Sequence, residues 1–169
     1  MACIFHVIGK KDVGKTSVIE KVVKEVKKYG LKVAVIKHSH HKLDLSGKDT
    51  DRYRNSGSDY IIFQEGEYES VLFMPNVSSL SLINVLPADV VIIEGFSNIE
   101  IGKKYVINSV DEIENLSKQI LNDVKNECKK EIRNLKLNGI TTAITSDHPL
   151  LLTLYNLMTI LGLRDVSSD

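Results

Sequence analysis

The sequence predicts an α/β protein of three layers, in which helices cover both faces of a mostly parallel sheet. Three observations lead to this fold class. Strand-like apolar runs alternate with segments of helical periodicity along the chain. A glycine-containing segment, residues 9–16, joins the first strand pattern to the first helix pattern. Residues 89–93 form a β-branched run behind an Asp, which is typical of a strand buried on both faces. A length of 169 residues suits one domain, and we expect a single domain over 1–169.

The amino-terminal elements follow from the spacing of apolar residues. A buried strand is expected over residues 2–8. A helix is expected over 15–29, because apolar residues recur there every three or four positions until Gly30 ends the pattern. The next expected elements are a strand at 32–36, a loop at 38–47, a short helix at 49–55, strands at 59–63 and 69–74, a short helix at 78–86, and strands at 89–93 and 104–107.

The carboxy-terminal part is expected to be mostly helical. Ser109 and Glu112 form a capping-box pattern, and apolar residues then line one side of a long helix as far as Leu135. The last strand is expected over 140–145. A final helix from Pro149 has only a narrow polar stripe, so it needs cover on more than one side, and this predicts a homodimer.

The composition of the chain indicates which binding partners and which cellular compartment to expect. Lys+Arg is 22 and Asp+Glu is 22, so the chain has no basic excess, and nucleic acid is not expected as a partner. No segment has the roughly 20 apolar residues that a membrane span needs, so no membrane association is expected. Cys3 and Cys128 have no CxxC neighbour and lie in apolar patterns. We expect both to be buried and reduced in a cytoplasmic protein without a signal peptide.

Residues 9–16, GKKDVGKT, match the phosphate-loop pattern G-x-x-x-x-G-K-[ST] in its required place between a strand and a helix. This motif predicts a P-loop NTPase-type fold. Lys15 is expected to reach the β- and γ-phosphates, the Thr16 hydroxyl to ligate Mg²⁺, and Ser17 to donate to the α-phosphate. The expected phosphate site consists of Gly9, Lys10, Lys11, Asp12, Val13, Gly14, Lys15, Thr16 and Ser17.

Glu94 ends the buried strand at 89–93, where P-loop proteins place a carboxylate that holds Mg²⁺ directly or through water. Gly95, next to it, lets the backbone approach a phosphate closely. Asp44, in the loop after the second strand, is a further carboxylate that could face the metal. Lys15, Glu94 and Asp44 are the expected catalytic residues, and Thr16, Glu94 and Asp44 are the expected metal ligands. The alternative is that Glu94 only ends the strand in solvent.

The loop after the second strand contains His38, His40, His41 and Asp44. Three interpretations stay open: a loop that faces the nucleotide, a solvated loop, or a transition-metal site. Recognition of the base is also open. Residues 108–111 and 145–147 could each bind a guanine edge, yet both stand where helices begin, and the capping role is the more common one.

Taken together, these motifs resemble the molybdopterin-guanine dinucleotide biosynthesis protein B (MobB) family. The resemblance rests on the phosphate loop, on Glu94-Gly95-Phe96, on the late segment TSDHPL, and most specifically on the middle of the chain. The residues that carry it there are Ile36, Lys37, His38, His40, His41, Asp44, Gly47, Lys48, Asp49, Arg52 and Gly57.

The resemblance implies a homodimeric protein that binds GTP with Mg²⁺, hydrolyses it slowly, and assists the nucleotidyltransferase that joins GMP to molybdopterin. It implies that Asp44 and Asp49 lie near the γ-phosphate. Gln64 and Asp147 are further candidates for nucleotide contact, and molybdopterin itself is a candidate ligand.

Two other functions compete with this one. A small-molecule kinase using ATP would need an arginine-rich lid, and the chain has few arginines: Arg52, Arg54, Arg133 and Arg164. A metallochaperone GTPase would use His38, His40 and His41 as metal ligands. No side chain is expected to act as a strong general base, so hydrolysis should be slow.

Overall fold

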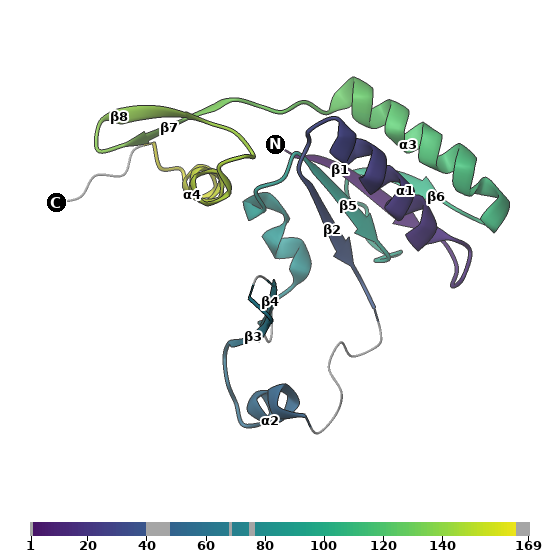
Figure 1. Ribbon diagram of the computed structural model, residues 1–169, viewed down its shortest axis with the longest axis horizontal. Coiled ribbons are helices and arrows are strands. Elements are labelled where there is room, and N and C mark those ends of the chain that lie inside the picture. Colours follow the sequence, from purple (N-terminus) through teal and green to yellow (C-terminus); the bar gives the residue numbers. More distant parts are fainter. Residues whose placement is uncertain (1, 40–47, 68, 75–76, 165–169) are drawn as a thin grey trace. The chain divides into compact units, whose positions relative to one another are not determined.

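The computed structural model describes residues 2–39, 48–67, 69–74 and 77–164 (Figure 1). The chain divides into two compact units. One unit combines Met1–His38 with Leu82–Asp169, and the other is Ser39–Ser81. The single domain expected over 1–169 stays a prediction.

The first unit is built on a parallel sheet, as predicted. Its strands are β1 (Cys3–Ile8), β2 (Val33–Lys37), β5 (Val90–Glu94) and β6 (Lys103–Val106), in the spatial order β2-β5-β1-β6. All neighbouring pairs are parallel, so their carboxyl ends meet at one edge. Strand β5 is buried along its whole length because it lies between two other strands and carries apolar side chains on both faces.

Two helices cover one face of this sheet. Helix α1 (Lys15–Lys28) and helix α3 (Ile113–Glu127), which follows the short 3₁₀ helix η2 (Val110–Glu112), pack against each other and run side by side in Figure 1. Their apolar stripes meet alternate residues of β1 and β5. The fully buried members of this core include Phe5, Val7, Val18, Val22, Val26, Val90, Ile92 and Val124.

The region after α3 differs from the prediction of a helix reaching Leu135. Helix α3 ends at Glu127, and Cys128 has an extended backbone. Strands β7 (Arg133–Leu137) and β8 (Ile140–Ile144) then form an antiparallel hairpin that is separate from the parallel sheet. The turn consists of Asn138 (φ 48°) and Gly139 (φ 79°), the residue pair that two-residue hairpin turns prefer.

Helix α4 (Pro149–Ile160) packs on this hairpin through a small apolar cluster. The cluster consists of Leu135 and Ile144 from the hairpin and Leu152 and Met158 from the helix. Other apolar side chains of the same region are exposed: Leu150, Leu157, Ile160 and Leu161. None of the helices among the described residues is both long enough and apolar enough to cross a membrane.

The second unit contains helix α2 (Asp49–Asn55) and the antiparallel hairpin of β3 (Ile61–Glu65) and β4 (Glu69–Phe73). The predicted pairing of these two strands is confirmed. The guanidinium of Arg54 lies 5.1 Å from the centre of the Phe73 ring, a cation–π contact that ties the helix to the hairpin. The short 3₁₀ helix η1 (Ser79–Val85) leads from this unit into the first.

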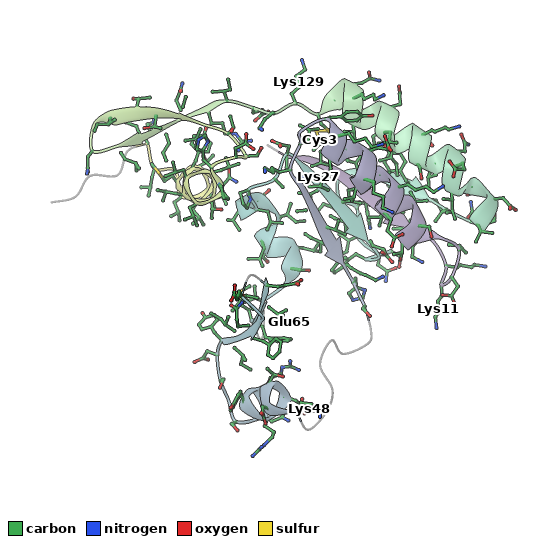
Figure 2. The ribbon with its side chains drawn as sticks, viewed as in Figure 1. Cys3, Lys11, Lys27, Lys48, Glu65 and Lys129 are labelled. Atoms are coloured by element: carbon green, nitrogen blue, oxygen red, sulfur yellow. A yellow bond between two sulfur atoms is a disulfide. The ribbon has the colours of Figure 1, made fainter. Side chains whose placement is uncertain are left out.

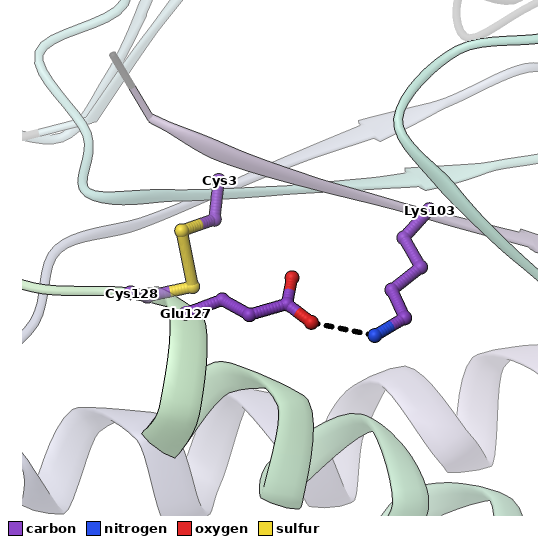
Figure 3. The surroundings of a disulfide bond; sticks show 4 residues. All are labelled: Cys3, Lys103, Glu127 and Cys128. Atoms are coloured by element: carbon purple, nitrogen blue, oxygen red, sulfur yellow. Dashed lines mark hydrogen bonds and ion pairs between the residues drawn. A yellow bond between two sulfur atoms is a disulfide. The ribbon is translucent and has the colours of Figure 1, made fainter.

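A disulfide joins Cys3, at the start of β1, to Cys128, at the end of α3 (Figure 3). The expectation of two reduced cysteines is therefore wrong. Periodicity could show that each residue is apolar, but it could not show that a strand start and a helix end 125 positions apart lie side by side. The two Cα atoms are 5.8 Å apart, within the usual range for a bridge.

A charged network lies beside the bridge. Lys103 Nζ is 2.5 Å from Glu127 Oε1, the contact dashed in Figure 3, and 3.1 Å from Asp123 Oδ2. The buried Tyr105 hydroxyl donates to Asp123 Oδ2 at 2.5 Å. This hydrogen bond and the Lys103 ammonium lower the pKa of Asp123, while burial raises the pKa of Tyr105. Strand β6 is thereby linked to helix α3.

Candidate functional site

The loop between β1 and α1 brings its backbone very close to a neighbouring strand. Gly9 has a φ of 159°, and a Cβ atom there would collide with the carbonyl oxygen of Ile107, which follows β6. Asp12 adopts a left-handed conformation with a φ of 61°. These two positions fold residues 9–14 into a compact loop that leads into the first turn of α1. An anion at this place would meet the positive end of the helix dipole.

Lys15 is turned back over this loop. Its Nζ donates to the carbonyl oxygen of Gly9 at 3.0 Å and to that of Lys10. Lys10 and Lys11 are exposed at the tip of the loop, and Figure 2 shows the Lys11 side chain pointing away from the sheet. Thr16 and Ser17 are also exposed. The loop therefore presents two cations and two hydroxyl groups to solvent at the carboxyl edge of the sheet, beside the half-buried Lys15.

Thr16 and Glu94 meet at the same edge. The Thr16 hydroxyl lies 3.3 Å from each carboxylate oxygen of Glu94. Glu94 is 7% exposed and Val7 is its register partner in β1, so the side chain points toward α1. Lys37, at the end of β2, completes the group, with its Nζ 3.2 Å from Glu94 Oε1 and 3.4 Å from Thr16 Oγ1.

Lys37 was not among the predicted site residues. The apolar run of β2 indicates a strand, and Lys37 ends that run much as Glu94 ends β5. Neighbouring parallel strands end at one edge of the sheet, so the place of Lys37 at the end of its strand was the sequence signal that it lies beside Glu94. In the structure Lys37 and Glu94 are register partners.

The oxygen atoms of this group fit a hard divalent cation. Mg²⁺ prefers a hydroxyl and a carboxylate as ligands and keeps several waters. Thr16 Oγ1 and the two Glu94 oxygens are close enough to share one ion, and the exposed side of Thr16 leaves room for water. The Lys37 ammonium contacts Glu94 Oε1 and Thr16 Oγ1, so a cationic group already lies against this pair of side chains.

Gly95 and His38 lie against each other next to Glu94, one of the two candidate metal ligands. A Cβ on Gly95 would come within 3.0 Å of His38 Cβ, so only glycine fits comfortably. The backbone N–H of His38 donates to the carbonyl oxygen of Glu94 at 2.9 Å, and the His38 ring packs at a tilt against Phe96 with 4.5 Å between ring centres. His40, His41 and Asp44 lie outside the described residues. Within the described ranges, no group of three or more His, Cys, Asp or Glu side chains is arranged to hold a metal.

Asp147 lies at the opposite edge of the sheet from the phosphate loop. Its carboxylate pairs with Lys130 and with Lys32, which directly precedes β2. Ser146 donates to Asp89, which directly precedes β5, at 2.7 Å. Asp147 is thus held near the amino end of β2, and the nucleotide contact expected of it stays a prediction. The strand before it, β8, pairs with β7 and not with the parallel sheet.

Residues 108–111, the other candidate for base recognition, also have a local role. Glu112 accepts a hydrogen bond from the backbone N–H of Asn108 at 3.0 Å, at the start of η2. Likewise the Thr145 hydroxyl accepts from the backbone N–H of Asp147 at 3.2 Å, ahead of α4. Both segments satisfy backbone groups where helices begin.

Asp49 and Gln64 belong to the unit Ser39–Ser81, and their expected contact with nucleotide stays a prediction. Asp49 stands in the first turn of α2 and pairs with Arg52 at 3.5 Å. Gln64 is held in its own hairpin, where its amide donates to the carbonyl oxygens of Gly66 and Glu69 and accepts from the Ser70 hydroxyl.

The parallel sheet, the loop between β1 and α1, and the Thr16–Glu94 pair define a protein of the P-loop NTPase fold class. Within that class, the model of the family described as molybdopterin guanine dinucleotide synthesis protein B (MobB) matches residues 4–125, and the chain belongs to that family.

Individual relatives agree with this assignment. A protein of Methanocaldococcus jannaschii is 37% identical over 98 residues, which are 55% of this chain and 40% of that protein. The molybdopterin-guanine dinucleotide biosynthesis adapter protein of Haemophilus influenzae is 33% identical over 107 residues, 59% of this chain and 60% of that protein. The matched part of the chain thus spans about 40% and 60% of the lengths of these two relatives.

Solved structures share the fold. The crystal structure of Bacillus subtilis MobB is 28% identical, with a TM-score of 0.50, over 62% of this chain and 67% of that one. The MobB homologue from Bacillus stearothermophilus is 19% identical, with a TM-score of 0.53, over 73% of this chain and 99% of that one. The second likeness concerns the fold alone.

Proposed function

We propose that this chain binds GTP together with Mg²⁺ and acts as an accessory protein of molybdenum cofactor maturation. In this role it assists a nucleotidyltransferase in attaching GMP to molybdopterin. One observation carries the nucleotide part of the proposal: the Lys15 and Thr16 end of the phosphate loop lies against Glu94 at the carboxyl edge of the sheet. Membership of the MobB family and the names of the relatives support the biosynthetic part.

The residues divide the work as follows. The loop backbone and Lys15 would bind the phosphates, while Thr16 and Glu94 would hold a metal ion, which would supply positive charge against the phosphates. Positioning and charge neutralisation are the chief tasks of a protein in such a site. The sequence offers no side chain as a strong general base, so we propose that hydrolysis is slow, below about 1 per second.

A homodimer and a cytoplasmic location are further parts of the proposal. The exposed apolar residues Leu150, Leu157 and Ile160 on α4 offer a surface that a second copy would bury. Light scattering at high protein concentration tests this, and a monomer mass there would remove the dimer from the proposal.

Calorimetric titration tests the nucleotide itself. GTP, GDP and ATP analogues are titrated with and without Mg²⁺, and we expect guanine nucleotides to bind more tightly than ATP. A protein that binds ATP equally well or better would be a candidate small-molecule kinase, and its resemblance to the family would then concern the fold only. A guanine-binding protein should next be mixed with the nucleotidyltransferase and molybdopterin, where it should raise the rate of GMP attachment.

A further inference from the structure

A histidine is buried in the middle of β1, where the proposed function gives it no role. His6 is 0% exposed, and its register partner in β5 is Ile93. Its neighbours Phe5 and Val7 point toward α1 and α3, so His6 lies on the other face of the sheet. A polar ring at such a place needs an explanation, because apolar side chains of similar size fill the rest of this strand.

The ring of His6 binds the turn that follows Glu94. Its Nε2 donates to the carbonyl oxygen of Gly95 at 2.5 Å, while Nδ1 has no hydrogen-bond partner within the described part of the chain. The backbone N–H of Gly95 donates to the carbonyl oxygen of Val7 at 3.3 Å. Strand β1 therefore holds Gly95 by both of its backbone polar groups, one through the main chain and one through the His6 ring.

This turn has an unfavourable backbone. Gly95 has a φ of 92° and Phe96 a φ of 52°, and an aromatic residue seldom adopts the left-handed conformation. Strain of this kind persists only where surrounding contacts enforce it, and it is frequent at functional sites. The enforcing contacts here are the His6 hydrogen bond to Gly95 and the tilted ring contact between Phe96 and His38.

We propose that His6 is a positioning residue of the metal site: its hydrogen bond to Gly95 fixes the turn after β5 and so aims the Glu94 carboxylate at Thr16. The inference rests on the proposed function, because it gives His6 a part in Mg²⁺-dependent nucleotide binding. His6 touches neither the metal nor the nucleotide. It acts through the Gly95 peptide, as partners behind the ligands of a metal do.

The test separates this role from ordinary core packing. His6→Leu fills the space without a donor, and His6→Gln restores an N–H near the position of Nε2. Val91→Ala is the matched control, since Val91 is fully buried on the same face of β5 and its loss weakens packing without touching Gly95. The readout is the ratio of GTP-analogue dissociation constants measured without and with Mg²⁺. Phosphate binding by the loop enters both constants, whereas Glu94 enters only the second.

We expect His6→Leu to reduce this Mg²⁺ ratio by about 10-fold or more, the usual effect of losing a partner behind a metal ligand. His6→Gln should recover most of the ratio, and Val91→Ala should keep it despite a lower melting temperature. An unchanged ratio in His6→Leu, or a Gln variant as impaired as the Leu variant, would overturn the role of the hydrogen bond.

A second measurement needs no nucleotide. Amide hydrogen exchange of Gly95 should accelerate in His6→Leu but not in Val91→Ala, because the turn loses its anchor only in the former. If wild-type protein binds no GTP analogue, the proposed function fails, and with it the metal-site role of His6. Exchange then still decides whether His6 fixes the turn, and equal exchange in both variants would refute that as well.

Discussion

The Thr16 hydroxyl and the Glu94 carboxylate lie 3.3 Å apart although 78 positions separate them in the chain. Strands β1 and β5 are direct neighbours in the sheet. Thr16 follows β1 through the phosphate loop, and Glu94 is the last residue of β5. A hydroxyl and a carboxylate brought together in this way form a small oxygen-rich pair beside the phosphate loop.

Glu94→Gln should remove most of the gain in nucleotide affinity that Mg²⁺ provides, by about 10-fold or more, since an amide is a far poorer ligand for Mg²⁺ than a carboxylate. Affinity measured in EDTA should change little. Lys37→Met is the matched control: it removes the ammonium that contacts the same oxygens and should leave the Mg²⁺ effect intact or larger. Equal losses in both variants would mean that Glu94 does not serve the metal.

Lys15→Ala should weaken binding of GTP by about 10- to 100-fold, because a charge-assisted contact to phosphate is lost. The fold should persist, since within the described part of the chain the ammonium donates only to carbonyl oxygens of its own loop. Lys24→Ala, an exposed lysine on the same helix, serves as the control for the change in net charge. Calorimetry measures both, and full affinity in Lys15→Ala would show that residues 9–17 are not the phosphate site.

Gly9→Ala should lower the free energy of unfolding by about 1–3 kcal/mol more than Gly30→Ala does. Both glycines have a positive φ, but an added Cβ meets the backbone of Ile107 at position 9 and nothing within 4 Å at position 30. Gly30→Ala should therefore lower the free energy of unfolding by only about 1–2 kcal/mol, the cost of backbone strain alone. Denaturant titration gives both values, and equal losses would contradict the close approach of the loop to Ile107.

Reduction of the Cys3–Cys128 bridge should lower the unfolding free energy by about 4–5 kcal/mol, the chain-entropy figure for a loop of this length. Melting curves with and without dithiothreitol measure the change. The double variant Cys3→Ala with Cys128→Ala should melt like the reduced protein and should not respond to dithiothreitol. Two free thiols in native protein kept without reductant would show that the bridge does not form in solution.

Stability should fall in acid through Asp123. Its pKa is lowered in the folded protein by the hydrogen bond from Tyr105 and by Lys103, so folding is favoured above the ordinary carboxyl pKa of about 4. That contribution is lost as the pH falls through the lowered pKa, when the carboxylate takes up a proton. In Asp123→Asn the difference in unfolding free energy between pH 7 and pH 3 should be smaller than in wild type. An unchanged difference would argue against a stabilising role for the contacts of Asp123 with Tyr105 and Lys103.

Local patterns predicted the core of the fold because each element there carries its own signal. The apolar run of β5, the periodicity of α1 and the phosphate loop between β1 and α1 are visible within short windows of sequence. Glu94 and Thr16 could be paired on paper because parallel strands end at one edge. The structure confirms the parallel sheet and brings those two residues together.

Errors occurred where the outcome depends on distant contacts. Apolar spacing continues past Glu127, so the pattern predicts a helix as far as Leu135 where the structure has strand β7 and the Asn138-Gly139 turn. The role of Cys128 depended on the position of Cys3, which no local pattern contains.

The bridge between Cys3 and Cys128 also makes the intervening chain a covalent ring, from which the hairpin β7–β8 and helix α4 extend as a branch. Both Thr16 and Glu94 lie within the ring. A single proteolytic cut between them would open the ring without releasing either residue, since the two ends would stay joined through the sulfur atoms. The phosphate loop and the carboxylate would thus remain parts of one molecule after a nick that would split an uncrosslinked chain in two.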